Sequence, residues 1–242
     1  MNEPLIRKAN LFGAWSGVYY CVLMGVGLLV VAGFFPLHNP SAGADEIAKI
    51  FRDDAVRIRV GMVIMMWGSA FFIFWTAAAA DYVSRIEGRC GPLTHWVNMG
   101  GYSNTIFTFF PAMYWIVNTY RADERSADMI QMMNDFAWIQ FLGNVSLTGP
   151  MFVAIAVAAL NDKSADPVFP RWVAYVTVWS LLLIVPDQLL SFFKSGPFAW
   201  NGIFSFWVPV CVFCSWFLML SWLMRRKILR DGGRVVGTVV SA

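Results

Sequence analysis

The sequence is poor in the side chains from which soluble proteins build their surfaces and catalytic sites. Only 14% of its 242 residues are charged, and it contains two histidines and four cysteines. Soluble domains average about 25% charged residues, so this scarcity argues against a soluble globular protein. The formal net charge of +3 is too small and too scattered to indicate binding of nucleic acid.

Recognisable catalytic motifs are also missing. His38 and His95 are too few for a membrane di-iron oxygenase, and their positions do not favour a bis-histidine haem site. Cys211 and Cys214 form a Cys-x-x-Cys pair, but they lie in an apolar run without a redox motif's strand and helix, so we expect buried core thiols. There is no nucleophile elbow, phosphate-binding glycine loop or diphosphate-binding aspartate pair. We therefore predict no bound metal and no cofactor.

Apolar residues dominate the chain instead, with 58% hydrophobic and 17% aromatic residues. About 20 consecutive apolar residues are needed to span a bilayer. Six such runs occur, at residues 11–35, 60–80, 95–119, 134–160, 172–193 and 200–224. They predict an all-α, polytopic transmembrane helical bundle that forms a single domain over residues 1–242. The first run is longer than the hydrophobic region of a signal peptide, so we interpret it as a spanning helix.

The distribution of lysine and arginine predicts the orientation. The N-terminus, residues 81–94, residues 161–171 and the C-terminal tail together hold 11 of these residues, whereas the opposite connections hold 7. Loops rich in lysine and arginine stay in the cytoplasm. We therefore predict a multi-pass protein of the cell membrane, in bacteria the inner membrane, with both termini in the cytoplasm.

The longest connection, residues 36–59, contains an amphipathic stretch. Its apolar residues share one helical face: Ile47, Ile50, Phe51, Ala55 and Ile58. This pattern predicts an interfacial amphipathic helix between the first two spanning helices. On the outer surface it would either simply connect them or form a lid.

Asp187 is the first functional candidate because it lies inside the apolar run SLLLIVPDQLLSFF. A charge in a spanning helix costs roughly 2.5 to 3.5 kcal/mol on insertion scales, so it is expected to face a partner, the bundle interior or a water-filled cavity. Helical spacing puts Ser180, Ser191 and Lys194 on the same stripe. Lys194 would either reach back to the carboxylate or extend to the outer interface. The alternative is a structural aspartate satisfied by polar groups on a neighbouring helix.

A second polar group is predicted on the run 134–160. Asp135 lies near the same outer boundary as Asp187, either as a second candidate acid or as a helix N-terminal charge near the headgroups. Gln140, Asn144 and Thr148 form a polar line at positions i, i+4 and i+8. Glycine and proline residues within this run predict locally irregular backbone there.

The remaining candidate ligand-binding residues are expected around the same outer end: Tyr114, Asn118, Trp138, Trp200 and Asn201. The aromatic side chains would form pocket walls, or they would face lipid and anchor the protein at the interface. Hydrogen bonds between helices are the alternative role of the asparagines.

Three segments resemble a group of uncharacterised bacterial multi-pass membrane proteins of similar length: IFRDDAVRIRVGMVIMMWG, MNDFAWIQF and FPRWVAYVTVWSLLLIVPDQLLSFFKSGPFAWNGIFSFW. The resemblance extends from about Asp45 to Phe213. It implies a six-helix membrane architecture. It carries no activity, ligand or catalytic residue that transfers to this chain.

Three functional hypotheses follow. In the first, an outer-leaflet-side pocket binds or moves a hydrophobic small molecule such as a lipid, isoprenoid or sterol-like compound, whose polar group Asp187 and Asp135 orient. In the second, one of these acids is the proton donor of an intramembrane cyclase or isomerase acting on a terpenoid or sterol-like substrate. In the third, the protein is an accessory subunit whose apolar faces contact membrane lipids and a partner subunit or a second copy. The first is favoured, because an enzyme would normally show two convergent groups with distinct acid and base roles.

Overall fold

The computed structural model describes the backbone of residues 3–240 and the side chains of residues 3–231. The described residues are helical throughout apart from short connections, and they contain no β-strand. In chain order the main elements are α1 (Glu3–Gly25), η1 (Val26–Val31), α2 (Ala44–Asp53), α3 (Ala55–Glu87), α4 (Pro92–Tyr120), α5 (Ala127–Leu142), α6 (Val145–Asn161), α7 (Arg171–Ile184), η2 (Val185–Phe192), η3 (Ile203–Trp207) and α8 (Val208–Val240). The predicted all-α helical bundle is confirmed.

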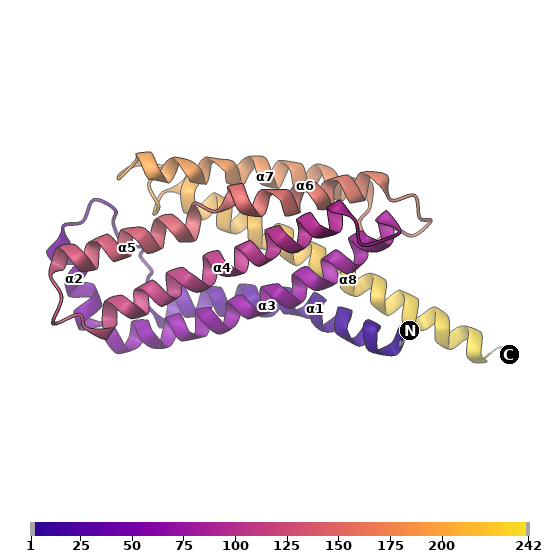
Figure 1. Cartoon of the computed structure of the whole chain (residues 1–242), viewed down its shortest axis with the longest axis horizontal. Helices are drawn as coiled ribbons and strands as arrows, with labels where there is room; N and C mark the ends of the chain where they lie inside the picture. The colour runs from indigo at the N-terminus through magenta and orange to yellow at the C-terminus, as the bar shows by residue number, and fades with distance from the viewer. Residues whose placement is uncertain (1–2, 241–242) are drawn as a thin grey trace.

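The long helices run up and down along one axis, and the two termini lie at the same end of the bundle (Figure 1). Short α2 lies at the opposite end, beside α5. The central helix is α4, which packs on α3, α5 and α6. The last helix, α8, packs mainly on α1 and α7. Each predicted apolar run therefore lies largely within one of these elements or within two consecutive ones.

Five helical stretches of the described residues are long and apolar enough to cross a membrane: Glu3–Val31, Ala55–Glu87, Ala127–Asn161, Arg171–Phe192 and Ile203–Asp231. Helix α4 has 29 residues but is not among them. Several of its buried side chains are polar, including Asn104, Thr108 and Asn118, which lowers its apolar character. A membrane-embedded protein follows from these helices, whereas the sixth crossing and the side on which the termini lie remain predictions.

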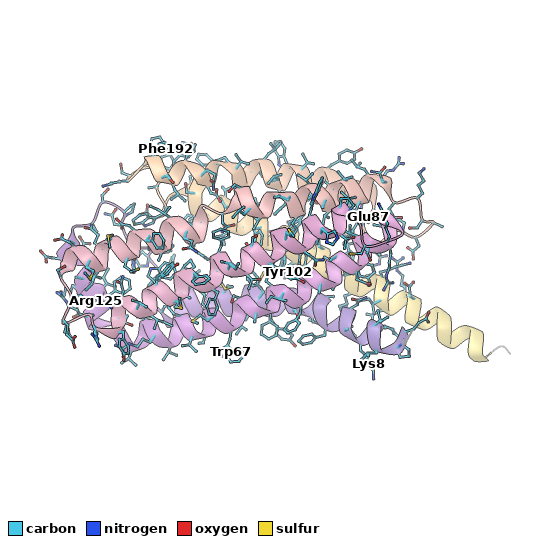
Figure 2. All side chains as sticks on the ribbon, in the orientation of Figure 1. Lys8, Trp67, Glu87, Tyr102, Arg125 and Phe192 are labelled. Atoms are coloured by element: carbon cyan, nitrogen blue, oxygen red, sulfur yellow. The ribbon has the colours of Figure 1, made fainter. Side chains whose placement is uncertain are left out.

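Large apolar side chains cover much of the outside of the bundle. Trp67 is 71% exposed and Phe192 is 79% exposed, and both project outward from the ribbon (Figure 2). Soluble monomers rarely expose so much contiguous apolar surface, because water contact with it is unfavourable. A lipid environment removes that cost.

Small residues allow α1, with its continuation η1, to approach α3 closely. A Cβ atom added to Gly13 would lie 2.6 Å from the Cβ of Ala78 and 2.7 Å from the carbonyl oxygen of Phe74. One added to Gly27 would lie 2.7 Å from the carbonyl oxygen of Gly61. The two helix backbones are thus nearly in contact at both ends of their crossing.

The amphipathic helix between the first two long helices is present as α2. Its apolar side chains Ile47 and Phe51 are buried, because α2 packs against α5 and contacts α3 and α4. Arg52 donates to the carbonyl oxygens of Ala122 (3.0 Å) and Arg125 (3.0 Å) at the α4–α5 turn. The apolar face of α2 is therefore turned toward the bundle, and the helix is held there by hydrogen bonds.

Candidate functional site

A cavity of about 150 Å³ lies in the middle of the bundle. Its walls come from α1 and η1, α4, the α5–α6 junction, the α7–η2 junction, η3 and α8. Apolar and aromatic side chains form most of the lining, including Met24, Leu28, Phe141, Phe152, Ile184, Phe206 and Phe213. The polar lining residues are Tyr20, Cys21, Asn104, Thr108, Asn144, Thr148, Asp187 and Cys214. An apolar concavity with a few convergent polar groups is the usual form of a small-molecule site.

Asp187 is the charged residue of this lining, and it is only 3% exposed. Helix α7 ends at Ile184, and the chain continues as the 3₁₀-helix η2. Pro186 lacks the backbone N–H that would continue an α-helix, which explains a change of helix type at this point. The backbone is therefore irregular beside Asp187.

The change of helix type rearranges the predicted polar stripe. A 3₁₀-helix has three residues per turn, so residues three apart share a face and residues four apart do not. Leu190 is accordingly buried with Asp187, whereas Ser191 and Lys194 are exposed. Ser180 is buried, but it lies in a separate groove between α7 and α8. The prediction that Ser180, Ser191 and Lys194 line one stripe with Asp187 assumed a continuous α-helix, and in this fold they lie outside the cavity.

Gln188 is the neighbour that stabilises the Asp187 carboxylate. Its Nε2 donates a hydrogen bond to Oδ1 of Asp187 at 3.0 Å. Helix η2 packs against both α5 and α6, which are interrupted at Gly143 and Asn144. The break turns Asn144 and Thr148 toward the cavity, while Gln140, one turn earlier, is half-buried and not part of its lining.

Tyr20 and α4 supply further polar groups to the cavity lining. The amide of Asn104 donates to the hydroxyl of Tyr20 at 3.4 Å, and Thr108 donates to the carbonyl oxygen of Asn104 at 3.1 Å. Cys21 on α1 and Cys214 on α8 are free, half-buried thiols that both line the cavity. Cys211 is exposed, so the expectation that both thiols of the Cys-x-x-Cys pair are buried in the core is wrong.

The cavity is not fully enclosed. Its half-buried lining residues lie mostly on two neighbouring helices: Cys21 and Gly25 on α1, Leu29 on η1, and Val210, Phe213 and Cys214 on α8. We therefore place the opening between the α1–η1 helix and the beginning of α8. Both helices are long and apolar enough to cross a membrane, so an opening between them would be lateral, toward lipid chains.

A buried aromatic cluster closes the end of the cavity nearer α2. Trp138 is fully buried, and its ring packs at 6.3 Å from those of Phe141 and Phe206, which both line the cavity. Trp200 stacks on Trp138 with a centroid distance of 6.3 Å. The cluster contains these residues together with Phe34, His38, Phe51 and Trp115. Trp138 and Trp200 thus form the end wall behind the lining and do not face the cavity themselves.

His38 joins the loop after η1 to this cluster. Its Nδ1 lies 3.2 Å from Oδ1 of Asn134, and its carbonyl oxygen accepts a hydrogen bond from Nε1 of Trp200 at 2.8 Å. Burial lowers the pKa of His38 from 6.5 to about 4, although the hydrogen bond to Asn134 acts in the opposite direction. The ring is therefore neutral at pH 7.

Asp135 does not join Asp187. It is half-buried on α5, and it is not part of the cavity lining. The two acids predicted in the same outer part of the bundle are therefore in different environments. Lys194, which was expected either to reach Asp187 or to extend outward, is exposed, and its charge acts electrostatically on Asp135.

The other predicted residues have structural contacts away from the cavity. Asn118 is buried and donates to the carbonyl oxygen of Ile130 at 2.9 Å. Tyr114 packs on Phe136 with a centroid distance of 5.0 Å. Asn201 is half-buried in the turn before η3. Of the predicted ligand-binding residues, Asn144 lines the cavity with Asp187, as does Thr148 from the same predicted polar line.

Sequence reasoning missed the contributions of α1 and of the middle of α4. Glycines of the first helix pack on α3, which explains one of its faces but not the face that carries Tyr20, Cys21 and Met24 to the cavity. Asn104 and Thr108 lie four residues apart in an apolar run, and that spacing was the available signal. Comparison with protein-family models, curated proteins and solved structures gives no match to this chain.

Proposed function

We propose that this protein is a membrane-embedded binding or transport-type protein that holds a hydrophobic small molecule in the central cavity, against Asp187. The observation that carries the proposal is the position of this carboxylate, which is buried in the lining of a mostly apolar cavity. Keeping a carboxylate there costs free energy. A ligand that hydrogen-bonds to it would offset that cost.

The cavity limits the part of the ligand that it can hold. A cavity of about 150 Å³ in a protein core is large enough for benzene. A sterol or an isoprenoid is far larger, so only a ring, a head group or a chain end of such a molecule would occupy the cavity. The remainder would lie in the lateral opening between the α1–η1 helix and α8, among the lipid chains.

The proposal is tested with protein purified from membranes in mild detergent. Native mass spectrometry should show a retained small molecule on the wild-type protein and its loss from Asp187→Asn. The variant should keep an unchanged or higher melting temperature, because it removes a desolvated charge. Asp135→Asn is the matched control: it also removes an acid, but one outside the cavity, so it should retain the molecule.

Two results would contradict this proposal. If the wild-type protein retains no small molecule and no hydrophobic compound from a test panel raises its melting temperature, the cavity is not a binding site. If Asp187→Asn loses its fold while binding per folded molecule stays unchanged, the aspartate has a structural role. Incubation with a retained molecule also tests the enzyme hypothesis, since a cyclase or isomerase would convert it into a product of equal mass and different retention time.

A further inference from the structure

The charge balance of the cavity restricts the chemistry of its ligand. Asp187 supplies a carboxylate, and none of the described residues that line the cavity is lysine, arginine or histidine. Nor do the described residues contain a group of three or more histidine, cysteine or acidic side chains able to hold a metal ion. Because the carboxylate has no cation beside it in the cavity, an anionic ligand would be repelled, and a cationic one would be attracted.

The hydrogen-bond donors of the lining are largely engaged by the protein itself. Asn104 donates to Tyr20, and Asn144 donates to the carbonyl oxygen of Phe141 at 2.8 Å. The hydroxyls of Thr108 and Thr148 donate to backbone carbonyl oxygens of their own helices. The Asp187 carboxylate, in contrast, accepts one hydrogen bond from Gln188 and has capacity for more. The cavity therefore suits a ligand that donates hydrogen bonds.

Aromatic rings line the same cavity as this acceptor and come from several helices. Tyr20, Phe141, Phe152, Phe206 and Phe213 all line the cavity, and they come from α1, α5, α6, η3 and α8. The faces of aromatic rings attract cations, and this attraction is strongest where water is excluded. A carboxylate within aromatic walls is a combination that recognises an organic ammonium group, with the rings holding the apolar part of the same molecule.

We propose that the ligand of this cavity is a small hydrophobic amine bound as its ammonium cation, whose N–H groups donate to the Asp187 carboxylate and whose apolar part lies against the aromatic walls. This inference rests on the proposed binding function and narrows it to one ligand class. The cavity volume of about 150 Å³ sets the size of the bound part at roughly one aromatic ring, since an apolar cavity of that volume holds benzene.

Benzylamine and benzyl alcohol provide a matched pair of probes. They have nearly the same size and the same ring, but benzylamine is a cation at neutral pH and the alcohol is neutral. Binding is measured on the wild-type protein from the rate at which N-ethylmaleimide labels each cysteine, followed by peptide mass spectrometry. Cys21 and Cys214 line the cavity, whereas Cys90 is exposed outside it. A ligand in the cavity should slow labelling of the first two and leave Cys90 unchanged.

We expect benzylamine to protect Cys21 and Cys214 with an apparent Kd at least about tenfold lower than that of benzyl alcohol, because a hydrogen bond between charged groups stabilises a complex more than one between neutral groups. In Asp187→Asn this preference should disappear while protection by benzyl alcohol remains. Asp135→Asn should keep the preference. The comparison within the wild-type protein requires no variant, so it decides the question even if Asp187→Asn does not fold.

The outcomes separate this inference from the proposed function. If both probes protect the two cysteines equally, the cavity binds hydrophobic molecules without selecting a cation, and the inference is overturned while the proposed function stands. If neither probe protects them at any concentration up to its solubility limit, both are overturned. Equal preference in wild type and Asp187→Asn would show that the carboxylate does not recognise the amine.

Discussion

At the residue scale, Asp187 and His38 are two buried titratable side chains with different surroundings. Asp187 has the cavity on one side and Gln188 as its neighbour. His38 is enclosed by Phe34, Phe51 and Trp138. The aromatic rings around His38 provide no opposite charge, so they favour the neutral imidazole. The cavity beside Asp187 leaves room for a ligand that offsets the cost of burying its carboxylate.

His38 makes the stability of the fold depend on pH. The pKa of His38 is about 4 in the folded protein and 6.5 when unperturbed, so the unfolded chain binds the proton first on acidification. The free energy of unfolding should therefore fall as the pH decreases from about 6.5 to 4, by at most roughly 3 kcal/mol from this residue. Above about pH 6.5, the contribution of His38 to the free energy of unfolding does not change with pH.

Melting temperatures measured in detergent at pH 7 and pH 5 test this dependence. His38→Gln keeps a polar side chain without an ionisable imidazole, so the loss of stability between the two pH values should be smaller than in the wild-type protein. His95→Gln is the control, because His95 is exposed. An equal loss in His38→Gln and the wild-type protein would show that His38 is not responsible.

At the element scale, sequence patterns predicted where helices occur better than how they end or change type. The predicted runs 134–160 and 172–193 are each helical over nearly their whole length, but one is broken at Gly143 and Asn144 and the other becomes a 3₁₀-helix at Val185. The spacing of apolar residues shows which face of a helix is buried, but it does not show where the number of residues per turn changes. Residues beyond such a change therefore point in directions other than those expected for a continuous α-helix, as Ser191 and Lys194 show.

The α1–α3 contact gives an element-scale prediction. Gly13→Ala places a Cβ atom 2.6 Å from that of Ala78, so the helices must separate or shift, at a cost of about 1 to 3 kcal/mol. The melting temperature should fall clearly. Gly149→Ala is the matched control, since its nearest neighbour would be the side chain of Leu181 at 3.9 Å, and alanine favours a helix over glycine. Equal stability of the two variants would contradict close packing at Gly13.

At the scale of the whole molecule, the arrangement of the termini bears on how the chain crosses the membrane. Both termini lie at the same end of the bundle (Figure 1), which requires an even number of crossings if the bundle axis crosses the bilayer. Five helices meet the length and composition needed for crossing. Two termini at the same end are therefore explained if α4, which is 29 residues long, makes a sixth crossing.

Reporter fusions at the two termini test this topology. We expect an alkaline phosphatase fusion, active only outside the cytoplasm, to be inactive at both ends, and a green fluorescent protein fusion to be fluorescent at both. Positive charges near both ends favour the cytoplasm. A phosphatase inserted after Glu124, in the turn between α4 and α5, should be active. Opposite signals at the two termini would indicate an odd number of crossings.

The sequence by itself determined the class of this protein, since composition and the length of its apolar runs depend only on local residues. It also identified Asp187, because a charge in an apolar run is visible without any knowledge of packing. Only the tertiary structure decided which side chains share a cavity with that carboxylate: Tyr20, Asn104 and Cys214 lie far from it in sequence and line the same cavity because α1, α4 and α8 meet around it. The faces that helices present to one another depend on crossing geometry and local changes of helix type, and neither is encoded in a single periodic pattern.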